Sequence, residues 1–292
     1  MRIDLHTHSD RSDGTDGPGA LVVQAVAAGL DVVALTDHDT AAGWHAARAA
    51  AVEAGIGFVP GMEISCAHDG AGVHLLAYLV DPDYPPLVDE LRRVLDGRSA
   101  RLPRILERLQ RVGVELTNAD VDAVSKSAEA RGRPHVADAL VAKGVVASRE
   151  EAFERFLSRG RPGYVDRYAA DLVPMLGLVA AAGGVSVLAH PWGRHSRQAL
   201  GPDTLARLKD AGLTGLEVDH VDHDEATRAQ LRDVAVELGL LMTGASDFHG
   251  EGKLDCPLGA NTTDPEQFER LLGAAAAAGA ASGRRTSAPV LP

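Results

Sequence analysis

The chain has 292 residues, 45% of them hydrophobic, which is enough for one large core or for a domain with an insertion. Its formal net charge of -12 argues against an extended nucleic-acid-binding surface, although it leaves open a local cationic site for an anionic substrate. We expect no signal peptide and no membrane span, since no apolar run reaches about 18 residues, and the isolated Cys66 and Cys256 favour a cytoplasmic protein in a reducing environment.

The first strand-like stretch runs from Arg2 to Leu5 and leads directly into His6 and His8. On an extended backbone, side chains two residues apart point to the same side, so both imidazoles should face one place. Asp13 follows a few residues later in a predicted turn. Two imidazoles aimed together are typical of half a metal site, but a single H-x-H motif also leaves a chance occurrence open.

The following segments alternate between helix and strand and carry polar side chains near the strand ends. We predict helices over residues 18–28 and 41–54, and strands over residues 31–35, 56–59 and 73–80. The continuous apolar runs of the strands are typical of a parallel sheet that is covered on both faces. His38 and Glu63 follow two of these strands, whereas His74 lies near the start of the last one.

The pattern changes between residues 86 and 160, where apolar residues at three- and four-residue spacing predict helices and no strand. We interpret this segment as an inserted helical subdomain, and most of its many arginines are typical of a solvated helix face. Arg133 and His135 lie within it in RGRPHV, and Arg161 lies at its exit in RGRPGYV. The predicted organisation is a discontinuous barrel of residues 1–85 and 161–281, a helical insertion of residues 86–160 and a flexible tail of residues 282–292.

Helix and strand alternate again in the second half of the chain. We predict helices and strands in turn over residues 172–182, 185–189, 203–211, 216–218, 225–238, 240–243 and 265–278. About seven strands alternating with helices predict an α/β fold, a β/α barrel of parallel strands whose functional groups lie beyond the carboxyl ends of the strands. His190, Asp247 and His249 follow this rule, and His74 is the exception.

Six motifs occur in order along the chain: DLHTHS, TDHD, GMEIS, HLLAY, AHP and SDFHG. Together they resemble the polymerase-and-histidinol-phosphatase (PHP) family of metal-dependent phosphoesterases. The resemblance implies a distorted (β/α)7 barrel of PHP type with an inserted helical subdomain, and a trinuclear metal centre. Carried over by motif, the implied ligands are His6, His8, Glu63 and Asp247 for one metal, Glu63, His74 and His190 for a second, and Asp13, His38 and His249 for a third.

Within this family, the helical insertion and the RPHVADAL and RGRPGYV stretches resemble the branch of small nucleotide phosphatases. Members of that branch remove the 3′-phosphate of nucleoside 3′,5′-bisphosphates, and some trim short RNA from the 5′ end. By analogy, Arg133, His135 and Arg161 would face the substrate phosphates. His223 and Lys253 are weaker candidates for the same contact.

For the remaining polar side chains near the motifs, we predict neither metal binding nor substrate binding. Asp4 and Asp37 are neighbours of the implied ligands, and we expect them to orient imidazoles and not to bind metal. We expect His195 to be solvated.

Imidazole and carboxylate ligands without thiolate suit Mn²⁺, Fe²⁺ or Zn²⁺, and we expect three divalent ions per chain with Mn²⁺ in first place. A hydroxide that bridges the metals would attack phosphorus. We therefore predict a phosphatase of small nucleotides that removes the 3′-phosphate of nucleoside 3′,5′-bisphosphates. A 5′–3′ exonuclease on short RNA or DNA and a histidinol phosphate phosphatase are alternatives, and a non-catalytic, metal-stabilised module is an alternative of another class. The general acid and the oligomeric state stay open.

Overall fold

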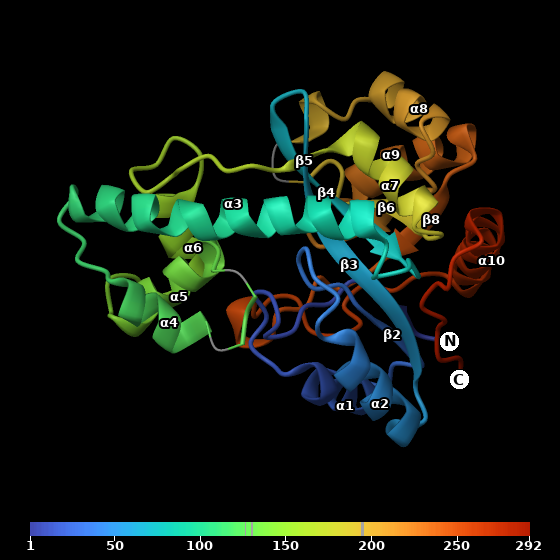
Figure 1. Cartoon of the computed structure of the whole chain (residues 1–292), viewed down its shortest axis with the longest axis horizontal. Helices are drawn as coiled ribbons and strands as arrows, with labels where there is room; N and C mark the ends of the chain where they lie inside the picture. Colours follow the sequence, from blue (N-terminus) through green and yellow to red (C-terminus); the bar gives the residue numbers. More distant parts are fainter. Residues whose placement is uncertain (126, 130, 194–195) are drawn as a thin grey trace.

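The sheet in Figure 1 curves around one end of the molecule, and a long helix extends from it toward a smaller group of helices. The computed structural model describes residues 1–292 except 126, 130, 194 and 195, so the prediction for His195 lies outside the described residues. In the described part of the chain, every helix is too short or too polar to span a membrane. The strands are β1 (Ile3–Asp4), β2 (Val32–Leu35), β3 (Gly57–His68), β4 (Ala71–Tyr78), β5 (Ala170–Asp171), β6 (Val185–Ala189), β7 (Gly215–Asp219) and β8 (Leu241–Gly244).

Seven of these strands form a nearly closed barrel in the order β1-β2-β3-β4-β6-β7-β8, and β5 pairs with β3 outside this path. Just beyond β1 and β8, Thr7 forms a parallel bridge with Phe248, which brings the two edges of the sheet together. On β2, Val33 and Leu35 pack into the core shared with helices, whereas Val32 and Ala34 pack into a second cluster. Both faces of this strand are therefore buried, as its apolar run predicts, and the expected distorted seven-stranded barrel is confirmed.

β4 departs from the predicted all-parallel arrangement, because it runs antiparallel to both β3 and β6. A two-residue turn, Asp69-Gly70, joins β3 to β4, and both of its residues have positive φ, 47° and 76°. An Asp-Gly pair in this conformation is a strong hairpin signal, and a hairpin makes neighbouring strands antiparallel. The prediction of parallel strands throughout is therefore wrong for β4.

The reversed direction of β4 explains the position of His74. The register pairs His74 with Ser65 of β3 and with Ala189, the residue before His190. Because β4 runs against its neighbours, its first residues lie at the end of the barrel where β6 finishes. His74 therefore shares this end with the other candidate ligands, although it lies early in its strand.

Six helices accompany the strands: α1 (Pro18–Ala27), α2 (Trp44–Ala54), α7 (Leu172–Ala181), α8 (Pro202–Asp210), α9 (Glu225–Leu238) and α10 (Pro265–Ser282). α10 continues past residue 278, where we predicted its end just before Gly279, and stops at Gly283, whose φ of 64° is readily adopted by glycine. Gly279 instead packs against Thr286, since the position of a Cβ there would lie 3.4 Å from the Thr286 hydroxyl oxygen. In the tail, Val290 exchanges two backbone hydrogen bonds of 2.8 Å with Phe58.

The described residues of the segment between β4 and β5 form helices joined by loops. The segment comprises α3 (Pro85–Gln110), α4 (Asn118–Ser125), α5 (Arg133–Ala142), α6 (Arg149–Ala152) and a π-helical turn, η1 (Phe153–Leu157). The first half of α3 packs into the barrel core through Leu87 and Val94, whereas Ile105 and Leu109 belong to a separate core with α4 and α5. α3 therefore connects the barrel mouth to the smaller group of helices (Figure 1).

Candidate metal centre

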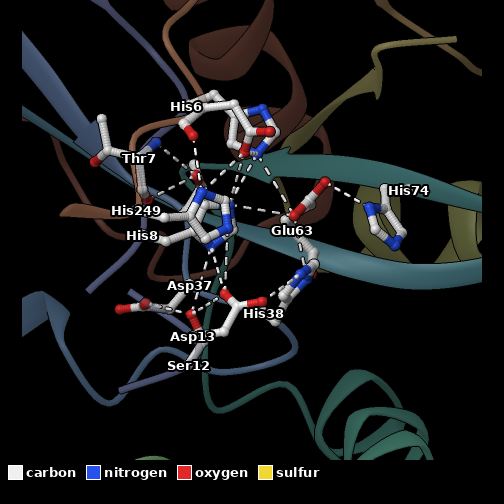
Figure 2. A network of polar contacts seen from close by, with 12 residues as sticks. His6, Thr7, His8, Ser12, Asp13, Asp37, His38, Glu63, His74 and His249 are labelled. Atoms are coloured by element: carbon white, nitrogen blue, oxygen red, sulfur yellow. Dashed lines mark hydrogen bonds and ion pairs between the residues drawn. The ribbon is translucent and has the colours of Figure 1, made fainter. Parts of the chain in front are cut away.

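Polar side chains from six strands and the segments that follow them meet at one end of the barrel, and most of them are buried (Figure 2). They are His6 and His8 beyond β1, Asp13 in the turn that follows, His38 beyond β2, Glu63 in β3, His74 in β4, His190 beyond β6, and Asp247 and His249 beyond β8. The structure thus brings together all nine residues that the motifs indicate. Glu63 lies inside β3, since this strand continues to His68 and not only to residue 59 as predicted.

The first group of donors surrounds a point between His6 and His8. Their Nε2 atoms lie 3.0 Å apart, and Asp247 Oδ1 lies 3.3 Å from each of them. Glu63 Oε2 completes the group at 3.5 Å from His6 Nε2 and 3.3 Å from His8 Nε2. Imidazole nitrogens and carboxylate oxygens that converge in this way suit a divalent cation.

Glu63 links this group to the others because its two oxygens face different imidazoles. Oε1 lies 2.7 Å from His74 Nδ1 and 3.1 Å from His190 Nε2. Oε2 also lies 3.1 Å from His38 Nδ1. The carboxylate is therefore placed to be shared between neighbouring cations.

The third group of donors lies around the Asp13 carboxylate. Its Oδ1 lies 3.4 Å from His249 Nε2 and 3.7 Å from His8 Nδ1, and its Oδ2 lies 3.6 Å from His38 Nε2. Four sets of three donors from the nine residues have ligand atoms within 4.8 Å of one another. His8 belongs to three of these sets, so the groups adjoin and form one cluster.

Burial and neighbouring charges favour the metal-binding forms of Glu63, His38 and His249, whereas Asp247 and Glu63 raise the pKa of His8 to about 9 against the effect of burial. Burial would raise the pKa of the Glu63 carboxyl, but the facing imidazoles of His74 and His38 hold it well below its usual range. Burial lowers the pKa of the His38 imidazole to about 3. For His249, burial and then the charge of His8 lower the pKa. An ionised carboxylate and neutral imidazoles are the forms that bind a metal ion.

The backbone is strained at two of the nine residues. His190 has a φ of 30° and Asp247 a φ of 55°, both in the left-handed region that residues other than glycine rarely adopt. Such a conformation costs about 1–3 kcal/mol and is found preferentially at functional sites. The Asp247 N–H donates to His6 O at 3.0 Å, so the strained residue is held against the first histidine motif.

Residues 4–137 match the model of the PHP domain. The chain is also 34% identical over 262 residues to the 3′,5′-nucleoside bisphosphate phosphatase of Chromobacterium violaceum, an alignment that covers 86% of this chain and 88% of that protein. The chain belongs to the PHP family.

Two further similarities agree with the PHP assignment. The 5′-3′ exoribonuclease of Haemophilus influenzae is 33% identical over 248 residues, with 85% of this chain and 90% of that protein covered. A crystal structure described as a metal-dependent phosphoesterase of Bifidobacterium adolescentis superimposes with a TM-score of 0.89 at 36% identity, covering 93% of this chain and 96% of that one. This PHP protein is therefore a metal-dependent phosphoric ester hydrolase.

A carboxylate that the sequence analysis did not single out orients the first histidine of the PHP site. Glu217 of β7 is fully buried, its Oε1 lies 3.0 Å from His6 Nδ1, and its Oε2 accepts from the His190 N–H at 2.8 Å. Burial would raise the pKa of Glu217, but the facing imidazoles of His6 and His220 hold it at about 2. Glu217 thereby keeps the His6 proton on Nδ1 and leaves Nε2 for a metal.

Asp4 and Asp37, which we expected to orient imidazoles, mainly hold backbone and hydroxyl groups. Asp4 accepts from the Ser246 N–H at 3.0 Å and from the Gly259 N–H at 2.8 Å. Asp37 accepts from the Ser9 N–H at 2.8 Å and from Ser9 Oγ at 2.6 Å. These carboxylates therefore support the loops that carry the ligands, whereas Glu217 contacts a ligand directly.

Replacing Glu217 with Gln should weaken metal binding by about 10–100-fold, the usual effect of losing a residue that orients a ligand. The amide offers one acceptor where the carboxylate offers two, so either His6 or the His190 N–H would lose its partner. Metal affinity measured by titration of the chelated protein is the test. Glu237→Gln on the exposed face of α9 is the matched control, and equal affinities in the two variants would contradict the role of Glu217.

The residues that we predicted to face the substrate lie at different distances from the PHP site. His135 comes closest, because it lines a small pocket together with Asp13 and His38, and its Nδ1 accepts from the Gly132 N–H at 2.9 Å. Lys253 donates to Asp247 Oδ2 at 2.8 Å. Both therefore adjoin the cluster of nine.

In the described part of the chain, no hydrogen bond or ion pair joins the other three predicted substrate-binding residues to the nine candidate ligands. Arg133 donates to Leu157 O at 3.1 Å. His223 is buried and its Nδ1 lies 2.9 Å from Val218 O. Arg161 is exposed in the turn after η1, and no hydrogen bond or ion pair of the described residues joins its side chain to the nine. Substrate contact by these residues stays a prediction.

Proposed function

We propose that this PHP protein hydrolyses phosphate monoesters of small nucleotides, in first place the 3′-phosphate of nucleoside 3′,5′-bisphosphates. The observation that carries the proposal is the pocket beside the cluster of nine. Asp13 and His38 line it from the barrel, whereas Arg98 and His135 line it from the helical segment. A substrate here could present one phosphate to the metal ligands and still meet cationic donors.

The nine donors fit three divalent ions, with Mn²⁺ in first place and Fe²⁺ or Zn²⁺ as alternatives, because imidazole and carboxylate ligands without thiolate suit these metals. When bound, such ions would activate water for attack on phosphorus and neutralise charge on the phosphoryl oxygens. The protein contributes rigid ligand positions through Glu217 and the strained Asp247. With three carboxylates among nine ligands, three divalent ions would leave the site net positive and suited to a phosphate.

We assign His135 and Lys253 to the substrate side of the site because they adjoin Asp13 and Asp247. Arg133, Arg161 and His223 are assigned by the resemblance, as further contacts of the nucleotide. The similarity to the bisphosphate phosphatase of Chromobacterium violaceum supports this substrate class. The similarity to the exoribonuclease of Haemophilus influenzae favours a second candidate, 5′–3′ cleavage of short oligonucleotides.

Phosphate release from a panel of substrates tests the proposal. The panel comprises a nucleoside 3′,5′-bisphosphate, a nucleoside 3′-monophosphate, histidinol phosphate, an aryl phosphate and a short 5′-phosphorylated RNA, each with added Mn²⁺. We expect the highest kcat/KM on the bisphosphate, with the nucleoside 5′-monophosphate as product. Faster release of mononucleotides from the RNA would replace the proposal with the exonuclease function.

A further inference from the structure

The turn that follows β1 and carries a candidate metal ligand is held by the helical segment between β4 and β5. We call residues 10–13 the ligand turn. Its first two carbonyls accept from the stretch between α4 and α5: Asp10 O from Ser127 Oγ at 3.5 Å, and Arg11 O from the Glu129 N–H at 3.2 Å. These bonds tie the first half of the ligand turn to the helical segment.

The second half of the ligand turn contacts α5 and α6 through its main chain. Burial lowers the pKa of the His135 imidazole, and a hydrogen bond to the Ser12 backbone acts in the opposite direction. Arg149, the first residue of α6, donates from Nη1 to Asp13 O at 3.0 Å. All four residues of the ligand turn therefore meet the helical segment, and the last of them belongs to the third group of donors.

Arg149 has a fixed direction because its remaining nitrogens hold a carboxylate. Nε and Nη2 donate to the two oxygens of Asp138 in α5, the bond from Nη2 being 2.6 Å long. A guanidinium group that pairs with a carboxylate through two parallel bonds is held in one plane. The Arg149 side chain is only 13% exposed, and its third nitrogen, Nη1, is left for the Asp13 carbonyl.

The same guanidinium group also lies against the loop that follows His249. A Cβ added at Gly252 would overlap Nη1 and Cζ of Arg149, so the glycine leaves the space that this side chain occupies. The Gly252 N–H donates to His249 O at 3.3 Å. Arg149 therefore contacts two segments that supply the third group of donors, one through Asp13 and the other just after His249.

We propose that Arg149 positions Asp13 and His249 for the cation that they share with His38. The inference rests on the metal binding in the proposed function, but not on the identity of the substrate. Asp13 lies in a turn and not in a strand, so its carboxylate depends on support from outside the sheet, and the helical segment supplies that support. The helical segment is thereby part of the metal centre, although none of the nine candidate ligands belongs to it.

Titration of the chelated protein with Mn²⁺ is the first test. Arg149→Gln should raise the Kd of one bound ion by about 10–100-fold and leave the others unchanged, because it removes the support of one group of donors. Arg155→Gln is the matched control, since this arginine is 49% exposed and pairs with Glu151 inside the helical segment, and every Kd should stay at its wild-type value. Wild-type affinities in Arg149→Gln, or equal weakening of all ions, would overturn the proposal.

Gly252→Ala tests the same contact without changing the arginine. The added methyl group would displace the guanidinium group, which is the end of a flexible side chain, and should raise the same Kd by a similar factor. Because both substitutions remove one contact, the double variant should bind Mn²⁺ no more weakly than the weaker of the two single variants. Effects that multiply in the double variant would show that the two residues act separately and would overturn the proposal.

Two further measurements separate positioning from folding and from the proposed function. Since all nine candidate ligands remain in Arg149→Gln, saturating Mn²⁺ should restore most of the wild-type kcat on an aryl phosphate. A lower Tm of the chelated variant together with a kcat that Mn²⁺ does not restore would assign Arg149 to the fold and overturn the proposal. If the wild type binds Mn²⁺ but does not hydrolyse the bisphosphate, the proposed substrate fails, and the titrations still decide the role of Arg149. A wild type that binds no divalent ion would overturn both.

Discussion

Glu63→Gln is expected to lower kcat/KM by at least about 1,000-fold. The two oxygens of Glu63 face different imidazoles, His74 and His190 on one side and His38 on the other. A glutamine offers one oxygen and no charge, so the two sides can no longer share one ligand. A 1,000-fold decrease corresponds to the loss of about 4 kcal/mol of transition-state stabilisation by the metals, since each tenfold change in rate is about 1.4 kcal/mol.

Asp37→Asn provides the comparison, because it removes a buried carboxylate that does not meet a metal ligand directly. Asp37 Oδ1 accepts from Ser12 Oγ at 2.6 Å, and Ser12 Oγ in turn lies 3.4 Å from His8 Nδ1. Its effect on the site is therefore indirect, and we expect a loss of about 10–100-fold. Steady-state kinetics and metal content of both variants check the prediction. Equal losses would mean that Glu63 is no more than a supporting group.

The alternation of helices and strands could be predicted from the sequence because each strand is a short apolar run and each helix ends near a glycine. The direction of β4 was missed, although the Asp69-Gly70 pair that produces the hairpin is visible in the sequence. The prediction relied on the overall α/β alternation, whereas the local turn decides the direction of the next strand. Gly279 misled the prediction of α10 because a glycine within a helix can serve close packing as well as a helix end.

Most of the nine candidate ligands could be predicted because they lie at or soon after strand ends, whereas His74 lies at the start of a reversed strand and Glu63 lies inside β3. Glu217 could not be assigned in this way, since its partners His6 and His190 lie far away in the sequence. A signal was present nevertheless: a charged residue within the buried strand β7 needs a partner.

Removal of the divalent ions by a chelator is expected to abolish phosphate release and to lower the Tm by about 5–10 °C. The nine ligands come from six strands and the segments that follow them, so bound ions would hold together elements that are distant in sequence. An ion present at 100 times its Kd stabilises the folded chain by about 2.7 kcal/mol, and each kcal/mol corresponds to about 2–4 °C for a large domain. Thermal unfolding with and without chelator measures this effect.

We expect each chain to bind three ions after reconstitution with Mn²⁺. Elemental analysis of the reconstituted protein measures this number. His8 belongs to three of the four sets of donors, and Glu63 faces imidazoles on both sides, so the ions would share ligands. Loss of one ion would leave a shared carboxylate partly uncompensated and weaken binding of the others. Activity should therefore return steeply as Mn²⁺ is added back. Recovery of full activity with at most one ion per chain would contradict the trinuclear assignment, because most of the clustered ligands would then be unused.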